Sequence, residues 1–516
     1  MNQVEYKIAA KNNDFFKISA KFYVNSKADL IFNFANSRPG RYENQYFSKN
    51  LISLVVIGEN GEKLPFDQID LSTYLVLAKP DLINFFTVQY TFRNGPLDAG
   101  NNIYFQENIL NILPCICLPF NDLTASVVLE LDVPNNITVN TTLTLDQVSE
   151  SRKYFFKAEN FEKLGDSAIT GGVLEENLNI YNFAQDDINY QINLITTNPP
   201  LNPENLINSL RKNIILINKK FKHLPFTNQF QFHIFVKKNR FLHALEHLDN
   251  TVLVIGSEKI DSLENNDLWK TGGELFISIL ETACHEYIHC WNIKTLKPKE
   301  LIKYNYSDVF PFETCYIAEG ITTYLGILFP ISTSSISVED LLENGDLDRY
   351  INAIFKSEIN KSCNFSLSYY SKNLWRDGYN SSFISAPSYV YGKGCLVAFM
   401  LDYYLMHRSN NRIRLVDILS KMCHNLNLVE NGYSHGDFIG EIKTSVSTLD
   451  QINIEDVNNE IDLFFDNFIF GNQAISETFS NMVNDLGMEI VQSEDKFKLR
   501  ITKNYPFTKD WLNLEG

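Results

Sequence analysis

"ETACHEYIHCWNIK", residues 281–294, contains the spacing H-E-x-x-H, which is formed by His285, Glu286 and His289. Residues four apart on a helix share one face, with about 5–6 Å between their Cβ atoms, so both imidazoles can bind one ion. Zinc takes neutral imidazoles and carboxylates in a tetrahedral shell, and catalytic sites keep one position open. The stretch therefore predicts a zinc site built on a helix.

The helix itself is predicted from apolar side chains that precede and interleave with this pattern. They recur at helical intervals, which indicates that one face of the helix is buried. The residues of this face are Phe276, Leu280, Ala283 and Tyr287. A helix that begins near "TGGELFISIL" is therefore expected to continue through the two histidines.

Glu286 follows the first histidine and has the chemistry of a general base. A metal lowers the pKa of a bound water to about 7, and a carboxylate beside it can then accept a proton. The same five-residue spacing arises by chance in about one chain of this length in a hundred, given average residue usage. The pattern alone therefore favours zinc over an ordinary helix, and a third ligand is expected downstream.

Two downstream carboxylates are candidates for that third ligand. Glu319 lies in "IAEGITTYLG", with 29 residues between it and His289, and Glu313 lies in "PFETC". On a single helix, six residues of separation place them about 240° apart around the axis. Only one of them can then point at the ion, and the spacing alone leaves both open.

The overall composition favours a globular enzyme and disfavours other classes of protein. The 516 residues are 44% hydrophobic and 21% charged, which predicts two or three packed domains. A net charge of -17 argues against a nucleic-acid partner. The sequence contains no run of about 18 apolar residues, so no membrane span is predicted. The N-terminus lacks the apolar core of a signal peptide, and the eight cysteines are scattered, so we expect a cytoplasmic protein with reduced thiols.

The periodicity of the chain changes along its length. From about residue 5 to 160 apolar and polar side chains alternate, as in "FFKISAKFYV" (15–24) and "ASVVLELDV" (125–133), which predicts a β-sandwich-like domain. After residue 198 two strand candidates, 230–236 and 250–256, precede the H-E-x-x-H helix. From about residue 337 the pattern is helical.

Four motifs together resemble the glycyl aminopeptidase family, metallopeptidase family 61, of the gluzincin type. The strongest are the zinc helix with its W-N-x-K-x-x-x-P continuation and the E-G-x-T-x-Y that follows it. The stretches are "HEYIHCWNIKTLKP" (285–298), "AEGITTY" (318–324), "VYGKGCLVAFMLD" (390–402) and "FFDNFIFG" (464–471). "RPGRYE" (38–43) fits the family's N-terminal region loosely.

The resemblance implies a role for each matching residue. His285, His289 and Glu319 would be the zinc ligands, with Glu286 as the general base. Tyr391 resembles the tyrosine that donates a hydrogen bond to the developing oxyanion, and such a donor stabilises charge that exists only in the transition state. The neighbouring Tyr389 is an alternative.

The resemblance also implies an anchor for the substrate's free ammonium. "HALEH" (243–247) stands where the family has G-G-x-E-H, so Glu246 would hold the ammonium by a charge-assisted bond. His243 and Ala244 replace the two glycines, which leaves the shape of the first-residue pocket and the strictness of a glycine preference open. The sequence defines no role for His243, His247 or Glu313.

We therefore expect a multidomain α+β protein with a β-sandwich-like N-terminal domain, a thermolysin-like zinc catalytic domain and a C-terminal all-α domain. The expected ranges are 1–165, 166–336 and 337–480, followed by a tail over 481–516. Many members of the family continue into a PDZ domain, and we expect none here, because only a strand or two is predicted in the tail.

The expected function is a zinc-dependent aminopeptidase that removes N-terminal Gly or Ala from peptide substrates. A zinc endopeptidase or a broad-specificity aminopeptidase is the alternative, because the glycine pair is lost. A non-catalytic peptide-binding protein is a third possibility, disfavoured by the intact Glu286 and Tyr391. The sequence leaves open the physiological substrate, the oligomeric state and whether a leader was removed.

Overall fold

A computed structural model of the chain describes most of its residues. These are residues 3–11, 14–24, 29–149, 153–197, 203–258, 269–362, 365–377, 388–449, 453–493, 496–502 and 511–514. The chain forms two compact units. The first comprises Met1–Pro199, Asn228–Glu258 and Asn305–Val309, and the second comprises Pro200–Thr227, Lys259–Tyr304 and Phe310–Gly516.

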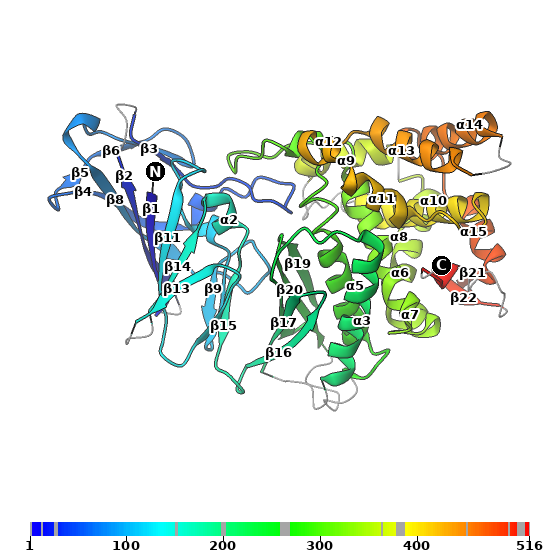
Figure 1. The fold of residues 1–516 in the computed structure, drawn as a ribbon, viewed down its shortest axis with the longest axis horizontal. Helices are drawn as coiled ribbons and strands as arrows, with labels where there is room; N and C mark the ends of the chain where they lie inside the picture. The colour runs from blue at the N-terminus through cyan, green and yellow to red at the C-terminus, as the bar shows by residue number, and fades with distance from the viewer. Residues whose placement is uncertain are drawn as a thin grey trace. The chain divides into compact units, whose positions relative to one another are not determined.

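An eight-stranded sheet is the largest element of the first unit (Figure 1). Its strands, in spatial order, are β13 (Thr144–Val148), β14 (Lys153–Ala158), β11 (Ser126–Asp132), β1 (Gln3–Ala9), β2 (Phe15–Tyr23), β8 (Phe85–Arg93), β4 (Leu51–Gly58) and β5 (Lys63–Leu64). Along β2 the side chains of Phe16, Ile18, Ala20 and Phe22 are buried and those between them are not. This alternation confirms the strand pattern that the sequence predicts.

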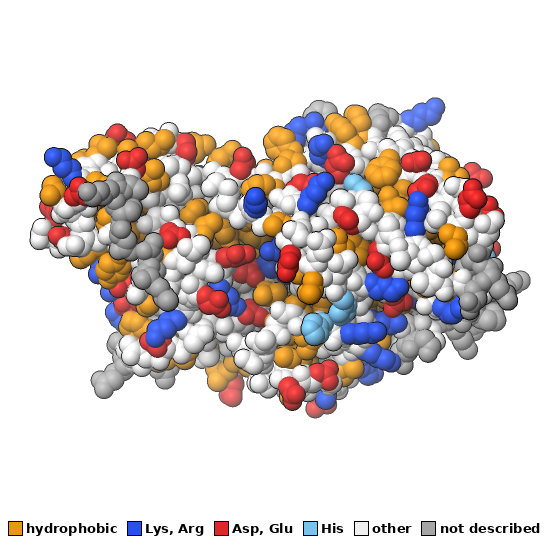
Figure 2. Space-filling view, turned by 45° about the horizontal axis from the view of Figure 1, so that its top comes forward, with side chains coloured by type: hydrophobic (Ala, Val, Ile, Leu, Met, Phe, Trp, Pro, Cys, Tyr) orange, Lys and Arg blue, Asp and Glu red, His pale blue; other side chains and the backbone are white. Residues whose placement is uncertain are grey.

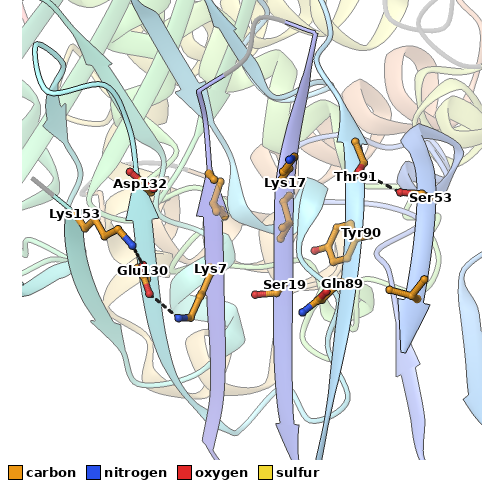
Figure 3. A pocket seen from close by; sticks show the side chains of 14 residues that line it. Lys7, Lys17, Ser19, Ser53, Gln89, Tyr90, Thr91, Glu130, Asp132 and Lys153 are labelled. Atoms are coloured by element: carbon orange, nitrogen blue, oxygen red, sulfur yellow. Dashed lines mark hydrogen bonds and ion pairs between the residues drawn. The ribbon is translucent and has the colours of Figure 1, made fainter. Parts of the chain in front are cut away.

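The other face of this sheet is polar (Figure 3). Glu130 on β11 accepts from Lys153 at 2.8 Å and pairs with Lys7 at 3.0 Å. Ser53 on β4 donates to Thr91 on β8 at 3.1 Å. Because cross-strand pairs satisfy these groups, this face needs no apolar cover.

Smaller sheets complete the first unit. Four strands pair in the order β12 (Thr138–Asn140), β15 (Ile169–Gly172), β10 (Ile109–Ile112) and β9 (Tyr104–Gln106), and three in the order β3 (Ile31–Asn33), β7 (Thr73–Val76) and β6 (Phe66–Gln68). A five-stranded sheet has the order β16 (Leu178–Gln185), β17 (Ile188–Ile195), β18 (Gln229–Lys238), β20 (Asn250–Ser257) and β19 (Phe241–Glu246). The predicted strands 230–236 and 250–256 lie in β18 and β20, and β19 is an edge strand.

The second unit is mainly helical (Figure 1). Its first helices are α3 (Glu204–Phe221), α5 (Glu274–Ile288), the π-helix η5 (Tyr316–Ile321), α6 (Thr322–Ser332), α7 (Val338–Asn344), α8 (Leu347–Ile359) and α9 (Leu367–Asp377). They are followed by the π-helix η6 (Ser388–Lys393), α10 (Gly394–Arg408), α11 (Leu415–His424), α12 (Leu426–Asn431), α13 (His435–Ser447), α14 (Ile454–Phe465), the π-helix η7 (Asp466–Phe470) and α15 (Ser476–Asp485). The mixed α+β class is confirmed, whereas the predicted boundaries at 165, 336 and 480 stay predictions.

Helix α5 lies in the core of the second unit, packed against α3 and α6. The hydroxyl of Tyr287 donates to Asn218 of α3 at 2.8 Å, and Trp291 stacks on Phe221 with 4.8 Å between ring centroids. Phe276, Leu280, Ala283 and Tyr287 are all buried. These contacts confirm the predicted buried face and hold the helix that carries the histidines.

The last described strands, β21 (Met488–Ser493) and β22 (Lys496–Ile501), form a two-stranded sheet beside α8. Acidic and basic side chains are interspersed over the face of the molecule in Figure 2. Within the described ranges, every cysteine is a free thiol and no helix is long and apolar enough to cross a bilayer.

Candidate active site

The structure brings His285 of α5, His289 at the C-cap that directly follows α5, and Glu319 of η5 to one point. The Nε2 atoms of His285 and His289 are 2.9 Å apart, and Oε2 of Glu319 lies 3.4 Å from each. Zinc–ligand bonds of about 2.0–2.1 Å in a tetrahedral shell require about 3.3 Å between ligand atoms. Two imidazole nitrogens and one carboxylate oxygen at these separations fit a zinc ion with one position left open.

Glu319 is almost fully buried, with 3% of its side chain exposed. Burial acts to raise the pKa of its carboxyl, but the imidazoles of His289 and His285 attract and hydrogen-bond the charged form. The pKa of Glu319 therefore lies well below its usual range. The ionised form is the one that binds a metal.

Asn292 connects the end of the zinc helix to the segment that carries Glu319. Its main-chain oxygen lies 2.9 Å from Nδ1 of His289, and its side-chain amide donates to the oxygen of Ile317 at 2.8 Å and to the hydroxyl of Thr322 at 2.9 Å. The first contact places the proton of His289 on Nδ1 and leaves Nε2 for the metal. Asn292 is fully buried, and sequence reasoning gave it no role beyond its place in the W-N-x-K motif.

Glu313, the alternative ligand, lies away from the metal-binding group. Its carboxylate is 44% exposed and forms an ion pair with Lys372 at 2.8 Å. Helical structure begins only after it, at Cys315, so Glu313 and Glu319 do not share the single helix that the sequence argument assumed. The separation of the two carboxylates is therefore set by a turn followed by a π-helix.

The two candidate tyrosines of η6 have different surroundings. Tyr389 is 1% exposed and stacks on Tyr370 with 4.3 Å between ring centroids, so it is part of the core. Tyr391 is partly exposed, and its ring centroid lies 6.3 Å from that of His285. The structure thus brings Tyr391 to the ligand group. Glu286, which lies between the two candidate histidine ligands in the sequence, is 6% exposed.

Glu246 belongs to the first unit, at the end of the edge strand β19, and is 4% exposed. Among the described residues, its Oε1 atom has no hydrogen-bond partner. Gly40 lies against this carboxylate in a left-handed conformation (φ 75°), and a Cβ atom at that position would lie only 2.6 Å from Oε1. A buried carboxylate oxygen with no donor is a costly arrangement unless a ligand supplies one.

The histidines on either side of Glu246 have structural partners. Nδ1 of His243 accepts from the main-chain N–H of Ala99 at 3.2 Å, and burial together with nearby arginines keeps its pKa well below the usual value. Nδ1 of His247 lies 3.1 Å from a carboxylate oxygen of Asp166. Both rings therefore help to hold the chain around Glu246, and the sequence pattern alone gave no sign of either contact.

Comparison with solved structures shows which proteins share this fold. An aminopeptidase N family protein from Idiomarina loihiensis superposes with a TM-score of 0.78 at 20% identity, over 95% of this chain and 79% of the other. An M1 zinc metallopeptidase from Deinococcus radiodurans superposes with a TM-score of 0.51 at 11% identity, over 91% and 93% of the two chains. No curated protein matches the sequence.

Family profiles match two long parts of the sequence. The peptidase M61 N-terminal domain matches residues 3–172, which contain the eight-stranded sheet. The M61 glycyl aminopeptidase profile matches residues 278–397, which contain His285, His289, Glu319 and Tyr391. Since these matches cover more than half of its residues, the chain belongs to the M61 glycyl aminopeptidase family and is a metallopeptidase.

Proposed function

We propose that the protein is a zinc-dependent aminopeptidase that removes small N-terminal residues, glycine or alanine, from peptides. The observation that carries this proposal is the group formed by His285, His289 and Glu319, whose ligand atoms lie 2.9–3.4 Å apart. A bound zinc ion would supply a Lewis acid that polarises the scissile carbonyl and acidifies a water molecule. The remaining steps belong to side chains of this protein.

Glu286 is the proposed general base. It follows the first histidine on α5, and its side chain is 6% exposed, which shields the carboxylate from bulk water. It takes a proton from the attacking water and returns this proton to the leaving amine. The carboxylate thus serves both halves of the hydrolysis.

Tyr391 is the proposed donor to the oxygen on which negative charge develops. The proximity of its ring to that of His285, together with its partial exposure, supports this role. A phenol that hydrogen-bonds the transition state more strongly than the substrate raises kcat. Changing Tyr391 to Phe should therefore lower kcat, whereas Tyr389→Phe should have little effect.

Glu246 is the proposed anchor for the substrate's ammonium group. Its buried carboxylate and the oxygen without a partner among described residues support this role. A charged hydrogen bond to the free amine fixes which peptide bond is presented, so cleavage follows the first residue. A blocked N-terminus would remove this interaction.

Selectivity between glycine and alanine is expected to be weak. One methyl group changes binding in an apolar pocket by about 1–3 kcal/mol, so strong exclusion of alanine would require a steric block. His243 and Ala244 replace the family's glycines on β19, and we expect the enzyme to accept both residues.

Turnover of Gly-, Ala- and Leu-anilides tests the proposal. The zinc-loaded enzyme should cleave the first two faster than Leu-anilide, lose activity with a chelator and regain it with zinc. Glu286→Gln, which retains the ligands, is the matched control and should bind zinc but not turn over. Equal cleavage of N-acetylated peptides would favour an endopeptidase, and undiminished activity without metal would refute zinc catalysis.

A further inference from the structure

The π-helix η5 meets the start of α10, directly after the π-helix η6, at a pair of glycines beside the candidate active site. Gly320 lies in η5 and Gly394 begins α10 directly after η6. A Cβ atom on Gly320 would lie 2.7 Å from Cα of Gly394 and 2.9 Å from the main-chain oxygen of Val390. A Cβ atom on Gly394 would lie 2.9 Å from Cα of Gly320. The two backbones are therefore in direct contact, with no space for a side chain on either.

The lack of room for a side chain, rather than the backbone conformation, explains why both positions are glycine. Neither has the positive φ that favours glycine, and both lie in continuous helical segments. Glycine is the least favourable residue after proline inside a helix, so local propensity does not explain them. Because the opposing atoms belong to the backbone, a change of side-chain rotamer could not relieve the clash that an added methyl group would cause.

Each glycine is close in sequence to a residue of the candidate active site. Glu319 immediately precedes Gly320, and Tyr391 lies three positions before Gly394. π-Helices are rare and often occur at functional sites. Here one π-helix carries the carboxylate ligand, the other carries the tyrosine, and the glycine contact joins the two.

A third glycine forms another close contact of the segment that carries Glu319. A Cβ atom on Gly326 of α6 would lie 2.9 Å from the main-chain oxygen of Glu281 and 3.1 Å from Cβ of His285. The η5–α6 segment thus contacts the zinc helix at Gly326 and the tyrosine segment at Gly320. The contact at Gly326 links the segment of Glu319 to the helix of His285, and both of these residues are proposed metal ligands. The contact at Gly320 links the segment of Glu319 to that of Tyr391.

We infer that the contact between Gly320 and Gly394 sets the position of Tyr391 relative to the metal ligands, which makes both glycines positioning residues for the oxyanion donor. This inference rests on the proposed function. A displacement of about 1 Å within a catalytic group can lower the rate by about 100-fold. A methyl group at the contact would separate the two backbones by a few tenths of an ångström or more and carry Tyr391 with η6.

Gly394→Ala tests the inference, because its single close contact makes it the milder of the two substitutions. We expect it to lower kcat by about 10–100-fold, change KM by less than about threefold and leave the zinc dissociation constant within about threefold of wild type. Gly326→Ala is the matched comparator and should weaken zinc binding by about 10–100-fold. Gly440→Ala, on α13 with no atom near its Cβ position, controls for substitution in a helix.

A double-mutant cycle with Tyr391→Phe separates positioning from general damage. Once the hydroxyl is absent, Gly394→Ala should lower kcat by less than about threefold, because the group it displaces no longer acts. A crystal structure of Gly394→Ala should show the Tyr391 ring displaced from its 6.3 Å separation from His285.

An equal loss of kcat in both backgrounds, an undiminished kcat in Gly394→Ala or an unmoved Tyr391 ring would overturn the inference. Failure of the proposed function would appear differently, as absence of turnover by the zinc-loaded wild type. In that case, the position of the Tyr391 ring in Gly394→Ala and the zinc dissociation constants would still decide whether the contact positions the tyrosine.

Discussion

Nδ1 of His289 donates a hydrogen bond of 2.9 Å to the main-chain oxygen of Asn292, whose side chain in turn reaches the π-helix that carries Glu319. One residue thus orients the imidazole of His289 and holds the backbone beside the carboxylate of Glu319, two of the proposed metal ligands. A π-helix departs from the regular i→i−4 pattern, and the amide of Asn292 donates to the oxygen of Ile317 at this point.

Replacing Asn292 by Asp should weaken zinc binding. The change keeps the shape of the side chain but removes the donors to Ile317 and Thr322, and unsatisfied buried groups cost about 1–3 kcal/mol each. We expect the zinc dissociation constant, measured by competition with a chromophoric chelator, to rise by about 10–100-fold.

Asn213→Asp is the matched control for this change. Asn213 is also a fully buried asparagine of the second unit, and it donates to Ser209 and Ser335. It should lower the melting temperature while leaving zinc affinity unchanged. Similar zinc affinities in the two variants would show that Asn292 stabilises the fold without orienting the ligands.

Glu319→Gln and Glu313→Gln should have opposite outcomes for metal binding. Glu319→Gln removes a buried anionic ligand of the proposed site. Zinc affinity should therefore fall by more than the approximately 10–100-fold expected when a residue that only hydrogen-bonds a ligand is replaced. Glu313→Gln removes partly exposed ionic contacts with Lys372 and His435, each worth at most about 1 kcal/mol, and should leave zinc affinity unchanged. Metal content after dialysis distinguishes them, and retention of zinc by Glu319→Gln would contradict the ligand set.

The protein should lose stability below about pH 6.5 because of His233, a buried residue of β18. Burial, with a smaller effect of His247, lowers the pKa of His233 to about 3, from an ordinary value of about 6.5. Between these values the unfolded chain binds more protons than the folded one, so stability falls as the pH falls. The loss reaches about 2 kcal/mol at pH 5.

The melting temperature of His233→Asn as a function of pH measures this effect. Asparagine can retain the acceptor that faces Thr170 and Asn193 but does not titrate, so its stability should decline less between pH 6.5 and pH 5 than that of the wild type. Replacement of the exposed His424 by Gln should leave the wild-type slope. Identical slopes in wild type and His233→Asn would refute the contribution of His233.

The sequence predicted those helices and strands whose pattern is visible within a few neighbouring residues. Helical spacing placed His285 and His289 on one face, and alternation identified the strands of the first sheet, because both depend on a repeat of two to four residues. The choice between Glu319 and Glu313 needed the resemblance, since the turn and π-helix between them have no regular period. The contact of Gly320 with Gly394 joins segments more than 70 residues apart, and no local pattern encodes it.

Glu246→Gln should impair cleavage only of substrates with a free N-terminus. The substitution keeps the size of the side chain but removes the charge that would face the ammonium group, and a hydrogen bond to a charged group contributes about 1.5–3 kcal/mol. We therefore expect kcat/KM on Ala-anilide to fall by about 10–150-fold, with zinc content unchanged, because Glu246 is not part of the His285, His289 and Glu319 group that could hold a metal. Gly40→Ala should act in the same direction, since its methyl group would lie within 3 Å of both carboxylate oxygens of Glu246 in a backbone conformation that disfavours alanine. Any residual activity on N-acetylated peptides should be the same in wild type and Glu246→Gln, and a parallel fall on blocked and free substrates would show that Glu246 supports the structure instead of binding the amine.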